Sequence, residues 1–432
     1  MDKNLSIVIL AAGKGSRMHS SKAKVLHSIS GKAMLYHITK TAKELSDDVS
    51  IVVAHQALSV KDEMAKYFSD INFIDQDLQN YPGTGGALKN YTPKYKKVLV
   101  LNGDMPLISK DALAGFLDSK SDIAMSVLEL NDASGYGRVV IKDGEVLKIV
   151  EQKDATKDEL DIKTVNGGVY MFSSNVLDSY IPKLTNNNAQ GEYYLTDVIE
   201  LAKKDSLKIE PILVDEHEFK GVNSKLDLAQ AEVIMQDKIK VKWMENGVVM
   251  QLPSTIYIED SVVFEGECVV ENGVKITGDS KIINSHIKSH SVVEDSLIEN
   301  SDIGPLAHIR PSCSIKDTHI GNFVEVKKSS LNGVKAGHLS YLGDSTIDSG
   351  TNIGAGVITC NYDGVKKYQT HIGKDVFVGS DTQLVAPLKI EDNVLIAAGS
   401  TITKDIKTGS LAISRTKQSN KDGFFYKFFG KK

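Results

Sequence analysis

The sequence predicts a Rossmann-like α/β domain with a mostly parallel sheet, followed by a parallel β-helix. Up to about residue 215, apolar runs of strand length alternate with segments of helical periodicity. After about residue 247, aliphatic residues recur at every sixth position instead. A stretch without glycine or proline separates the two patterns. We therefore expect three parts: residues 1–225, a helical linker over 226–246, and residues 247–432.

The first part is expected to be a sheet covered by helices. The run "LSIVIL" predicts a buried strand, and the helical spacing of Leu35, Ile38 and Ala42 predicts a helix after it. Buried strands that alternate with helices form parallel sheets, which bind ligands beyond the carboxyl ends of their strands. Further strands are expected at "SIVVA", "INFIDQ", "KVLVLNGD", "IAMSVLEL" and "GGVYMF".

The linker is expected to be helical. It contains neither glycine nor proline, and Leu228, Ala231, Ile234 and Met235 recur at helical spacing.

The third part carries a hexapeptide repeat. Aliphatic residues stand six positions apart throughout 372–402, and the same period occurs in 303–315 and 347–353. This period is typical of a parallel β-helix, in which each aliphatic side chain fills the inside of a coil. The period is disturbed in 320–347 and in 359–372, and we expect polar loops that build a site there.

Composition narrows the class of protein. The 51 Lys and Arg against 56 Asp and Glu give a net charge of −5, which argues against a nucleic-acid-binding surface. No apolar run approaches the roughly 20 residues of a membrane helix, so we expect no stable membrane insertion. Cys268, Cys313 and Cys360 form no CxxC pair, and no signal-like segment opens the chain. We therefore expect a cytoplasmic protein.

The loop "LAAGKGSRM", which follows the first strand, is a candidate phosphate site. It matches neither the P-loop nor the dinucleotide fingerprint, because Met18 stands where the third glycine of the fingerprint belongs. The main-chain amides of Ala12, Gly13 and Lys14 are placed to bind phosphate oxygens. Arg17 and Lys24 add positive charge. The alternative is a tight turn with solvated basic residues.

Asp104 and His338 are candidates for chemistry. A hydrophobic strand delivers Asp104 to the edge of the sheet, where one carboxylate suits Mg²⁺; a polar turn at the end of a strand is the alternative. His338 lies in the longer disturbance of the hexads and is a candidate proton acceptor, which Glu325 is expected to orient. A surface histidine without a role is the alternative.

The motifs resemble a known family over residues 10–415. The first half contains "LAAGKGSRM", "KAKVLH", "PGTGGAL", "NGDMPL", "GYGRVV", "IVEQKDA", "VNGGVY" and "GVNSKLDL". The second contains "RPSCSI", "KAGHLSYLGD", "NIGAGVITCNYDG", "VGSDTQLVAP", "IAAGS" and "AISR". Together they resemble the bacterial bifunctional N-acetylglucosamine-1-phosphate uridylyltransferases / glucosamine-1-phosphate N-acetyltransferases.

The resemblance implies a nucleotidyltransferase first half with Mg²⁺ between Asp104 and Asn223. Arg17 and Lys24 would neutralise charge on the phosphates during catalysis. A "NYP" insertion after Gln76, and Asn102 in place of a frequent tyrosine, depart from the family pattern. The residues implied to bind UTP or UDP-N-acetylglucosamine are Leu10, Ala11, Ala12, Gly13, Lys24, Gln76, Gly83, Thr84, Asn102, Gly103, Asp104, Gly137, Glu151, Asn166 and Asn223.

The resemblance also implies a left-handed, trimeric β-helix that carries the acetyltransferase, with His338 as the catalytic base. The amide of Ala355 is a candidate donor to the oxyanion. The residues implied to bind glucosamine-1-phosphate are Arg310, Lys327, Tyr341 and Asn352. Those implied to bind acetyl-CoA are Ala355, Asn361, Tyr362, Ser380, Ala398 and Arg415.

The function expected is therefore bifunctional. The second half acetylates glucosamine-1-phosphate, and the first transfers UMP from UTP to the product, which yields pyrophosphate and a precursor of peptidoglycan and lipopolysaccharide. The partners expected are these small molecules and two further copies of the chain. One alternative is a single-activity sugar-nucleotide pyrophosphorylase with a scaffold or regulatory β-helix, and another is a scaffold protein whose sites have decayed. The tail "KDGFFYKFFGKK" is expected to cover the last coils or to reach a neighbouring subunit's CoA site. A third alternative is a weak contact with a membrane surface.

Overall fold

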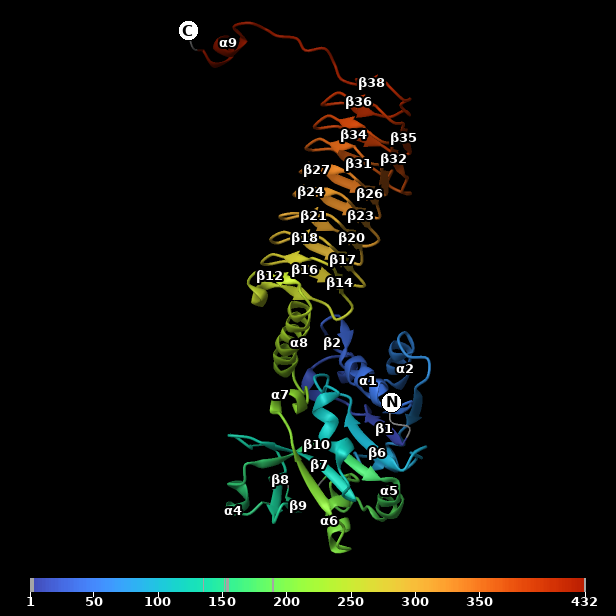
Figure 1. The fold of residues 1–432 in the computed structure, drawn as a ribbon, viewed down its shortest axis with the longest axis vertical. Helices are drawn as coiled ribbons and strands as arrows, with labels where there is room; N and C mark the ends of the chain where they lie inside the picture. The colour runs from blue at the N-terminus through green and yellow to red at the C-terminus, as the bar shows by residue number, and fades with distance from the viewer. Residues whose placement is uncertain (1–3, 135, 151, 153–154, 189, 431–432) are drawn as a thin grey trace. The chain divides into compact units, whose positions relative to one another are not determined.

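The computed structural model describes residues 4–134, 136–150, 152, 155–188 and 190–430. The chain forms two compact units, Met1–Met235 and Gln236–Lys432. Figure 1 shows the first unit in blue to green and the second in yellow to red. No helix among the described residues combines the length and the apolar character needed to cross a membrane.

The first unit is built on a mixed sheet. Its main path runs through β11 (Ile209–Leu213), β7 (Ile123–Glu129), β10 (Thr164–Ser173), β6 (Lys97–Asn102), β1 (Leu5–Leu10), β4 (Asp48–Val53) and β5 (Asn72–Asp75). β6, β1, β4 and β5 run parallel to one another, as the alternating pattern predicts. β10 runs antiparallel to both of its neighbours, β6 and β7. The carboxyl ends of four parallel strands therefore meet at one edge.

Both faces of this sheet are buried. On β1, Ile7 and Ile9 belong to one apolar core and Val8 to the other. A hairpin of β8 (Arg138–Lys142) and β9 (Glu145–Val150) extends from β10. The helices of the unit are α1 (Met34–Leu45), α2 (Ala57–Ala65), α3 (Ala114–Asp118), α4 (Lys157–Leu160), α5 (Ser174–Tyr180), α6 (Asp197–Lys204) and α7 (Glu216–Phe219).

Helix α8 (Lys225–Glu245) occupies the stretch where the sequence predicts a helical linker. Within the second unit, the buried amide of Gln236 pairs with the backbone of Ile258 as a strand residue would. Its Nε2 donates to the Ile258 carbonyl at 2.7 Å, and its Oε1 accepts from the Ile258 amide at 3.0 Å. This pair of hydrogen bonds joins the middle of the helix to the first coil.

The second unit is a parallel β-helix with three sheets. One sheet runs from β12 (Val249–Met250) to β38 (Leu411–Ala412), the second from β13 (Tyr257–Ile258) to β37 (Thr401–Ile402), and the third from β14 (Val263–Glu265) to β35 (Leu388–Ile390). Each strand pairs in parallel with the equivalent strand of the next coil. The aliphatic residues of the hexapeptides stack in register inside the coils, as Ile298 and Ile315 do.

The two disturbances of the hexapeptide period have different structures. Leu331 pairs with Ile347, so this coil is shorter than three hexapeptides, and its strands continue without an inserted loop. The prediction of an inserted polar loop between Ile320 and Ile347 is therefore wrong. The chain turns there through short corners that contain a residue in the left-handed conformation, such as Leu339 with φ of 50°. In the second disturbance Ile347 pairs with Ile372, and a polar loop does extend the coil.

The tail ends in α9 (Phe424–Phe429), whose aromatic side chains are all at least half exposed. In a single chain, α9 therefore does not bury these rings against the last coils, as one interpretation of the sequence expects.

Candidate active sites

A pocket of about 580 Å³ lies at the carboxyl ends of the parallel strands in the first unit. β1 ends at Leu10, and β6 ends at Asn102, both of which line the pocket. The fold therefore opens its pocket at the edge where α/β sheets bind ligands. The predicted site residues that line it are Leu10, Ala11, Ala12, Gly13, Lys24, Gln76, Gly83, Thr84, Asn102 and Asp104.

The glycine-rich loop is shaped to bring Lys24 into this pocket. Gly15 adopts a left-handed conformation with φ of 62°. A methyl group there would stand 2.5 Å from Lys24 Cβ, so only glycine fits the position. Gly103 lies behind the loop, where its amide donates to the Leu10 carbonyl at 2.9 Å.

Lys24 connects three segments that are distant in the sequence. Its ammonium forms an ion pair with the carboxylate of Asp104, and both side chains are largely buried, at 13% and 18% exposed. The same ammonium donates to Asn223 Oδ1 at 3.0 Å. Arg17 Nη2 donates to that oxygen as well, at 2.9 Å. The structure thus gathers Arg17, Lys24, Asp104 and Asn223 at one point.

The same point fits a divalent cation. A carboxylate oxygen of Asp104 and the amide oxygen of Asn223 converge on one positive charge, that of Lys24. The Val222 amide donates to the Asp104 carbonyl at 2.8 Å, which ties the two segments together. No cluster of three or more His, Cys, Asp or Glu residues suited to a metal exists among the described residues. Two protein oxygens are the donor set that Mg²⁺ accepts when phosphates and waters supply the rest.

Gln76 also lines this pocket, and two backbone carbonyls hold its side chain in place. Its Nε2 donates to the carbonyls of Tyr81 and Gly83, both at 2.9 Å. Its Oε1 is therefore left as the acceptor. Gly83 has φ of 90°, and a methyl group there would stand 2.6 Å from the Tyr193 carbonyl oxygen. Thr84 Oγ1 accepts from the Leu195 amide at 3.1 Å.

The remaining predicted residues of this site follow a chain of hydrogen bonds away from the pocket. Asn102 Nδ2 donates to the Gly168 carbonyl at 3.0 Å, and the Gly168 amide donates to Asn166 Oδ1 at 3.0 Å. The Asn166 amide donates to the Gly137 carbonyl at 3.1 Å. Glu151 lies outside the described residues.

Several residues of this pocket were not predicted. His55 follows β4, which lies beside β1, so its place after a buried strand is a signal that the sequence does contain. Glu192 also lines the pocket, and it reaches this place because Gly85 donates to the Tyr193 carbonyl at 2.8 Å. No local pattern in the sequence predicts this contact between Gly85 and Tyr193.

In the second unit, three cations gather on neighbouring coils. Lys327 lies close to Lys367 and Arg310, and these two positive charges hold the pKa of the Lys327 ammonium below its ordinary value. Such a cluster suits a phosphate. Lys367 was not predicted, because it comes from the loop of the second disturbance. Glu325 accepts from Arg310 Nη1 at 2.9 Å, so its partner is Arg310 and the expectation that it orients His338 is not met.

His338 ends β27 (Lys335–His338) with an exposed side chain. Ser340 Oγ lies 2.9 Å from the His338 carbonyl oxygen and 3.1 Å from that of Gly354, on the next coil. Since the two ends of a trans peptide point in opposite directions, a hydrogen bond to the Gly354 carbonyl orients the Ala355 amide away from Ser340. One serine thus links the histidine to the candidate oxyanion donor.

Tyr341, Asn361 and Asp344 surround Gly343. A methyl group on Gly343 would meet Tyr341 Oη at 2.5 Å and Asn361 Nδ2 at 2.8 Å. Asn361 Nδ2 also donates to the buried Asp344 carboxylate at 2.5 Å. Asn352, by contrast, lies on another sheet. It belongs to β30 (Asn352–Ile353) and pairs there with Lys335 of β27.

The predicted acetyl-CoA residues form a column along successive coils. The Ala355 carbonyl accepts from the Asp381 amide at 2.8 Å, and the Ser380 carbonyl accepts from the Gly399 amide at 2.8 Å. Arg415 Nη1 donates to the Ala398 carbonyl at 2.7 Å. Tyr362 is exposed at the start of the polar loop, with its hydroxyl 2.5 Å from the Gly364 carbonyl oxygen.

Comparisons with known proteins give family models for two parts of the chain and relatives over its whole length. A family model described as a MobA-like NTP transferase domain matches residues 7–157, and one described as bacterial transferase hexapeptide (six repeats) matches residues 369–404. A protein of Sulfurimonas denitrificans named "Bifunctional protein GlmU" is 65% identical over 434 residues, which cover 100% of both chains. Proteins of that name from Nitratiruptor sp. and Campylobacter jejuni subsp. doylei are 61% and 55% identical, each covering 99% of this chain and 100% and 99% of their own.

Proposed function

The chain belongs to the family of bifunctional GlmU proteins, and on this premise we propose how its two sites carry out the two reactions. It is a bifunctional transferase, with a uridylyltransferase activity and an acetyltransferase activity. We assign uridylyl transfer to the pocket of the first unit and acetyl transfer to the β-helix. The observation that carries the first assignment is the convergence of Arg17, Lys24, Asp104 and Asn223.

In uridylyl transfer, a phosphate oxygen of N-acetylglucosamine-1-phosphate attacks the α-phosphorus of UTP and displaces pyrophosphate. The nucleophile is already an anion, so no general base is needed. Catalysis therefore rests on alignment and on neutralisation of charge, which Arg17 and Lys24 supply. Asp104 and Asn223 would hold Mg²⁺, which when bound would neutralise further phosphate charge.

Gln76 would read the base of the nucleotide. Because its Nε2 is engaged by two backbone carbonyls, its Oε1 accepts a hydrogen bond, which the imide N–H of uracil supplies. The nitrogen at that position in cytosine is an acceptor and would face Oε1 without a proton. Gly137, Glu151 and Asn166 would hold the amino sugar.

In acetyl transfer, the amine of glucosamine-1-phosphate attacks the thioester carbonyl carbon of acetyl-CoA. The C–N bond forms, the C–S bond breaks, and CoA leaves as the thiol. His338 accepts the proton released by the amine and returns it to the sulfur. The amide of Ala355 would donate to the oxyanion of the tetrahedral intermediate.

The cluster of Arg310, Lys327 and Lys367 would bind the sugar phosphate, with Tyr341 on the same sheet as Lys327. Asn352, which lies on another sheet, would complete the glucosamine-1-phosphate site. The column of coils from Ala355 to Arg415, with Asn361 and Tyr362, would receive acetyl-CoA. We further propose a cytoplasmic homotrimer whose product supplies peptidoglycan and lipopolysaccharide synthesis.

Two assays on the purified full-length protein test this function. One follows CoA release from acetyl-CoA with glucosamine-1-phosphate, and the other follows pyrophosphate release from UTP with N-acetylglucosamine-1-phosphate and Mg²⁺. We expect activity in both. Pyrophosphate release without acetyl transfer would contradict the β-helix assignment and leave that unit as a scaffold.

A further inference from the structure

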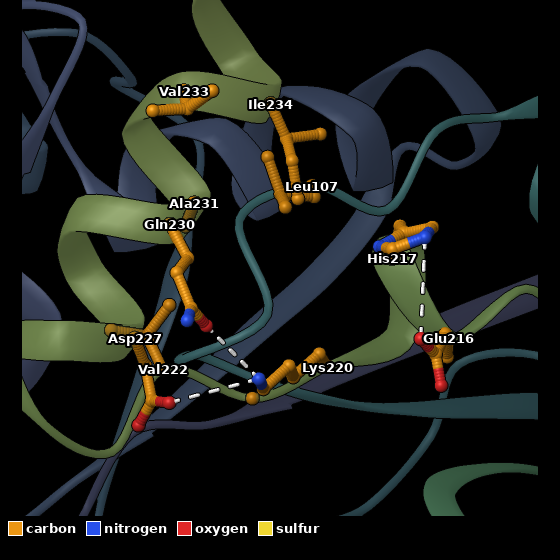
Figure 2. A pocket seen from close by; sticks show the side chains of 11 residues that line it. Leu107, Glu216, His217, Lys220, Val222, Asp227, Gln230, Ala231, Val233 and Ile234 are labelled. Atoms are coloured by element: carbon orange, nitrogen blue, oxygen red, sulfur yellow. Dashed lines mark hydrogen bonds and ion pairs between the residues drawn. The ribbon is translucent and has the colours of Figure 1, made fainter. Parts of the chain in front are cut away.

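The loop that carries Asn223 is backed by a second pocket, of about 420 Å³, between α7 and the first turns of α8. Leu107, Ala231 and Ile234 form its apolar side. Figure 2 shows Lys220 at its polar side, pointing toward Gln230 and Asp227 of α8. The Lys220 ammonium donates to Gln230 Oε1 at 3.1 Å and lies 3.9 Å from an oxygen of Asp227.

Asp227 is the hub of this arrangement. Its Oδ2 accepts from the Ser224 amide at 2.9 Å and from the Ser224 hydroxyl at 2.9 Å. The Asp227 amide in turn donates to Ser224 Oγ at 3.1 Å, which completes a reciprocal cap at the start of α8. The same Oδ2 also accepts from the backbone amide of Asn223 at 3.1 Å. This fourth hydrogen bond, with Asn223, is not part of the reciprocal cap between Ser224 and Asp227.

The contact fixes the residue whose side chain faces the nucleotide site. Asn223 has its amide N–H bound to Asp227 on one side and its Oδ1 bound to Lys24 and Arg17 on the other. Val222, just before it, donates to the Asp104 carbonyl at 2.8 Å. The backbone between Lys220 and Ser224 is therefore held from both the helix and the sheet.

We propose that Asp227 is a positioning residue for uridylyl transfer, which holds Asn223 so that its amide oxygen stays aligned with the Asp104 carboxylate. This inference rests on the proposed role of Asn223 as a metal ligand. Groups that orient metal ligands are worth about 10- to 100-fold in metal affinity. Lys220 supports the same carboxylate from the side of the second pocket.

The test measures binding of Mn²⁺ to the full-length protein with UDP-N-acetylglucosamine, by electron paramagnetic resonance of the free ion. Asp227→Ala is compared with the wild type and with Asn223→Ala, which defines the binding that depends on the protein ligand. Asp227→Asn retains an acceptor oxygen and is expected to recover part of the loss. Glu159→Ala is the matched control, because Glu159 closes a similar cap on α4 with Thr156.

We expect Asp227→Ala to weaken Mn²⁺ binding by about 10- to 100-fold. Acetyltransferase activity should not change, and Glu159→Ala should bind Mn²⁺ as the wild type does. A role in helix capping alone would lower the melting temperature without moving Mn²⁺ affinity. Wild-type Mn²⁺ affinity in Asp227→Ala, together with weakened binding in Asn223→Ala, would overturn the inference.

Two further outcomes remain distinguishable. Wild-type affinity in Asn223→Ala would contradict the proposed metal ligand itself, and the inference with it. Should Asp227→Ala fail to fold, Ser224→Ala decides the matter, because it removes the hydroxyl that orients the Asp227 carboxylate. The inference then expects a smaller weakening, and an unchanged Mn²⁺ affinity would contradict it.

Discussion

The ammonium of Lys24 donates a hydrogen bond of 3.0 Å to Asn223 Oδ1 while it is paired with the carboxylate of Asp104. The Lys24 ammonium thus contacts both of the protein oxygens that converge at this point. Asp104 and Asn223 would hold Mg²⁺ with these oxygens, and the Lys24 ammonium would then neutralise charge on the phosphates of the bound nucleotide.

Lys24→Met tests this role of Lys24, because it removes the charge and keeps an apolar stem. The uridylyltransferase kcat should fall by about 100-fold or more, the effect of losing one preorganised electrostatic group. The Mg²⁺ concentration for half-maximal rate at saturating UTP should not rise, since a competing cation has been removed. Steady-state kinetics over a range of Mg²⁺ concentrations measure both quantities, and a raised Mg²⁺ requirement would show that Lys24 assists metal binding.

Gln76→Glu should raise the KM for UTP by about tenfold. The variant replaces an NH₂ group that donates to the Tyr81 and Gly83 carbonyls with an oxygen that repels them, so the base-binding loop must move. Gln79→Glu adds the same charge to the same exposed loop and serves as the control. Pyrophosphate release at varied UTP concentration is the measurement, and equal effects of the two substitutions would point to charge alone.

Lys367→Met should change how acetyl transfer depends on pH. Lys367 and Arg310 lower the pKa of Lys327, so in the wild type Lys327 loses its charge at lower pH than an ordinary lysine. The KM for glucosamine-1-phosphate should therefore begin to rise at lower pH in the wild type than in the variant. Loss of one cation should also raise this KM by about tenfold near neutral pH.

Lys366→Met is the control for this prediction, because it removes the adjacent lysine of the same loop. In Lys366→Met, the KM for glucosamine-1-phosphate should begin to rise at the same alkaline pH as in the wild type. If this KM began to rise at the same pH in Lys367→Met as in the wild type, the electrostatic link between Lys367 and Lys327 would be contradicted.

The periodicity of apolar residues made much of the fold predictable from sequence. The buried strands, the helix at 225–245 and the stacked coils follow from local periodicity, which is a property of neighbouring residues. The antiparallel direction of β10 and the joining of Arg17 to Asn223 depend on contacts between distant segments. No local pattern contains such information.

In the β-helix, too, local sequence patterns do not predict the contacts between coils. The shift of period between Ile320 and Ile347 looks like an insertion in the sequence, whereas the coils become shorter and their strands continue. The sequence does not single out Lys367, because the neighbouring cation Lys327 lies on another coil. It predicts a contact of Glu325 with His338, whereas Glu325 pairs with Arg310. Cross-coil neighbours follow from register, which is known only once the length of each coil is known.

The most direct test of two separate sites in one chain is a reciprocal pair of variants, Asp104→Asn and His338→Ala, each assayed for both reactions. We expect Asp104→Asn to lose pyrophosphate release by about 100-fold or more and to keep acetyl transfer. His338→Ala should lose acetyl transfer by about 100-fold or more and keep pyrophosphate release. Loss of both reactions in either variant, or unimpaired acetyl transfer in His338→Ala, would contradict the account.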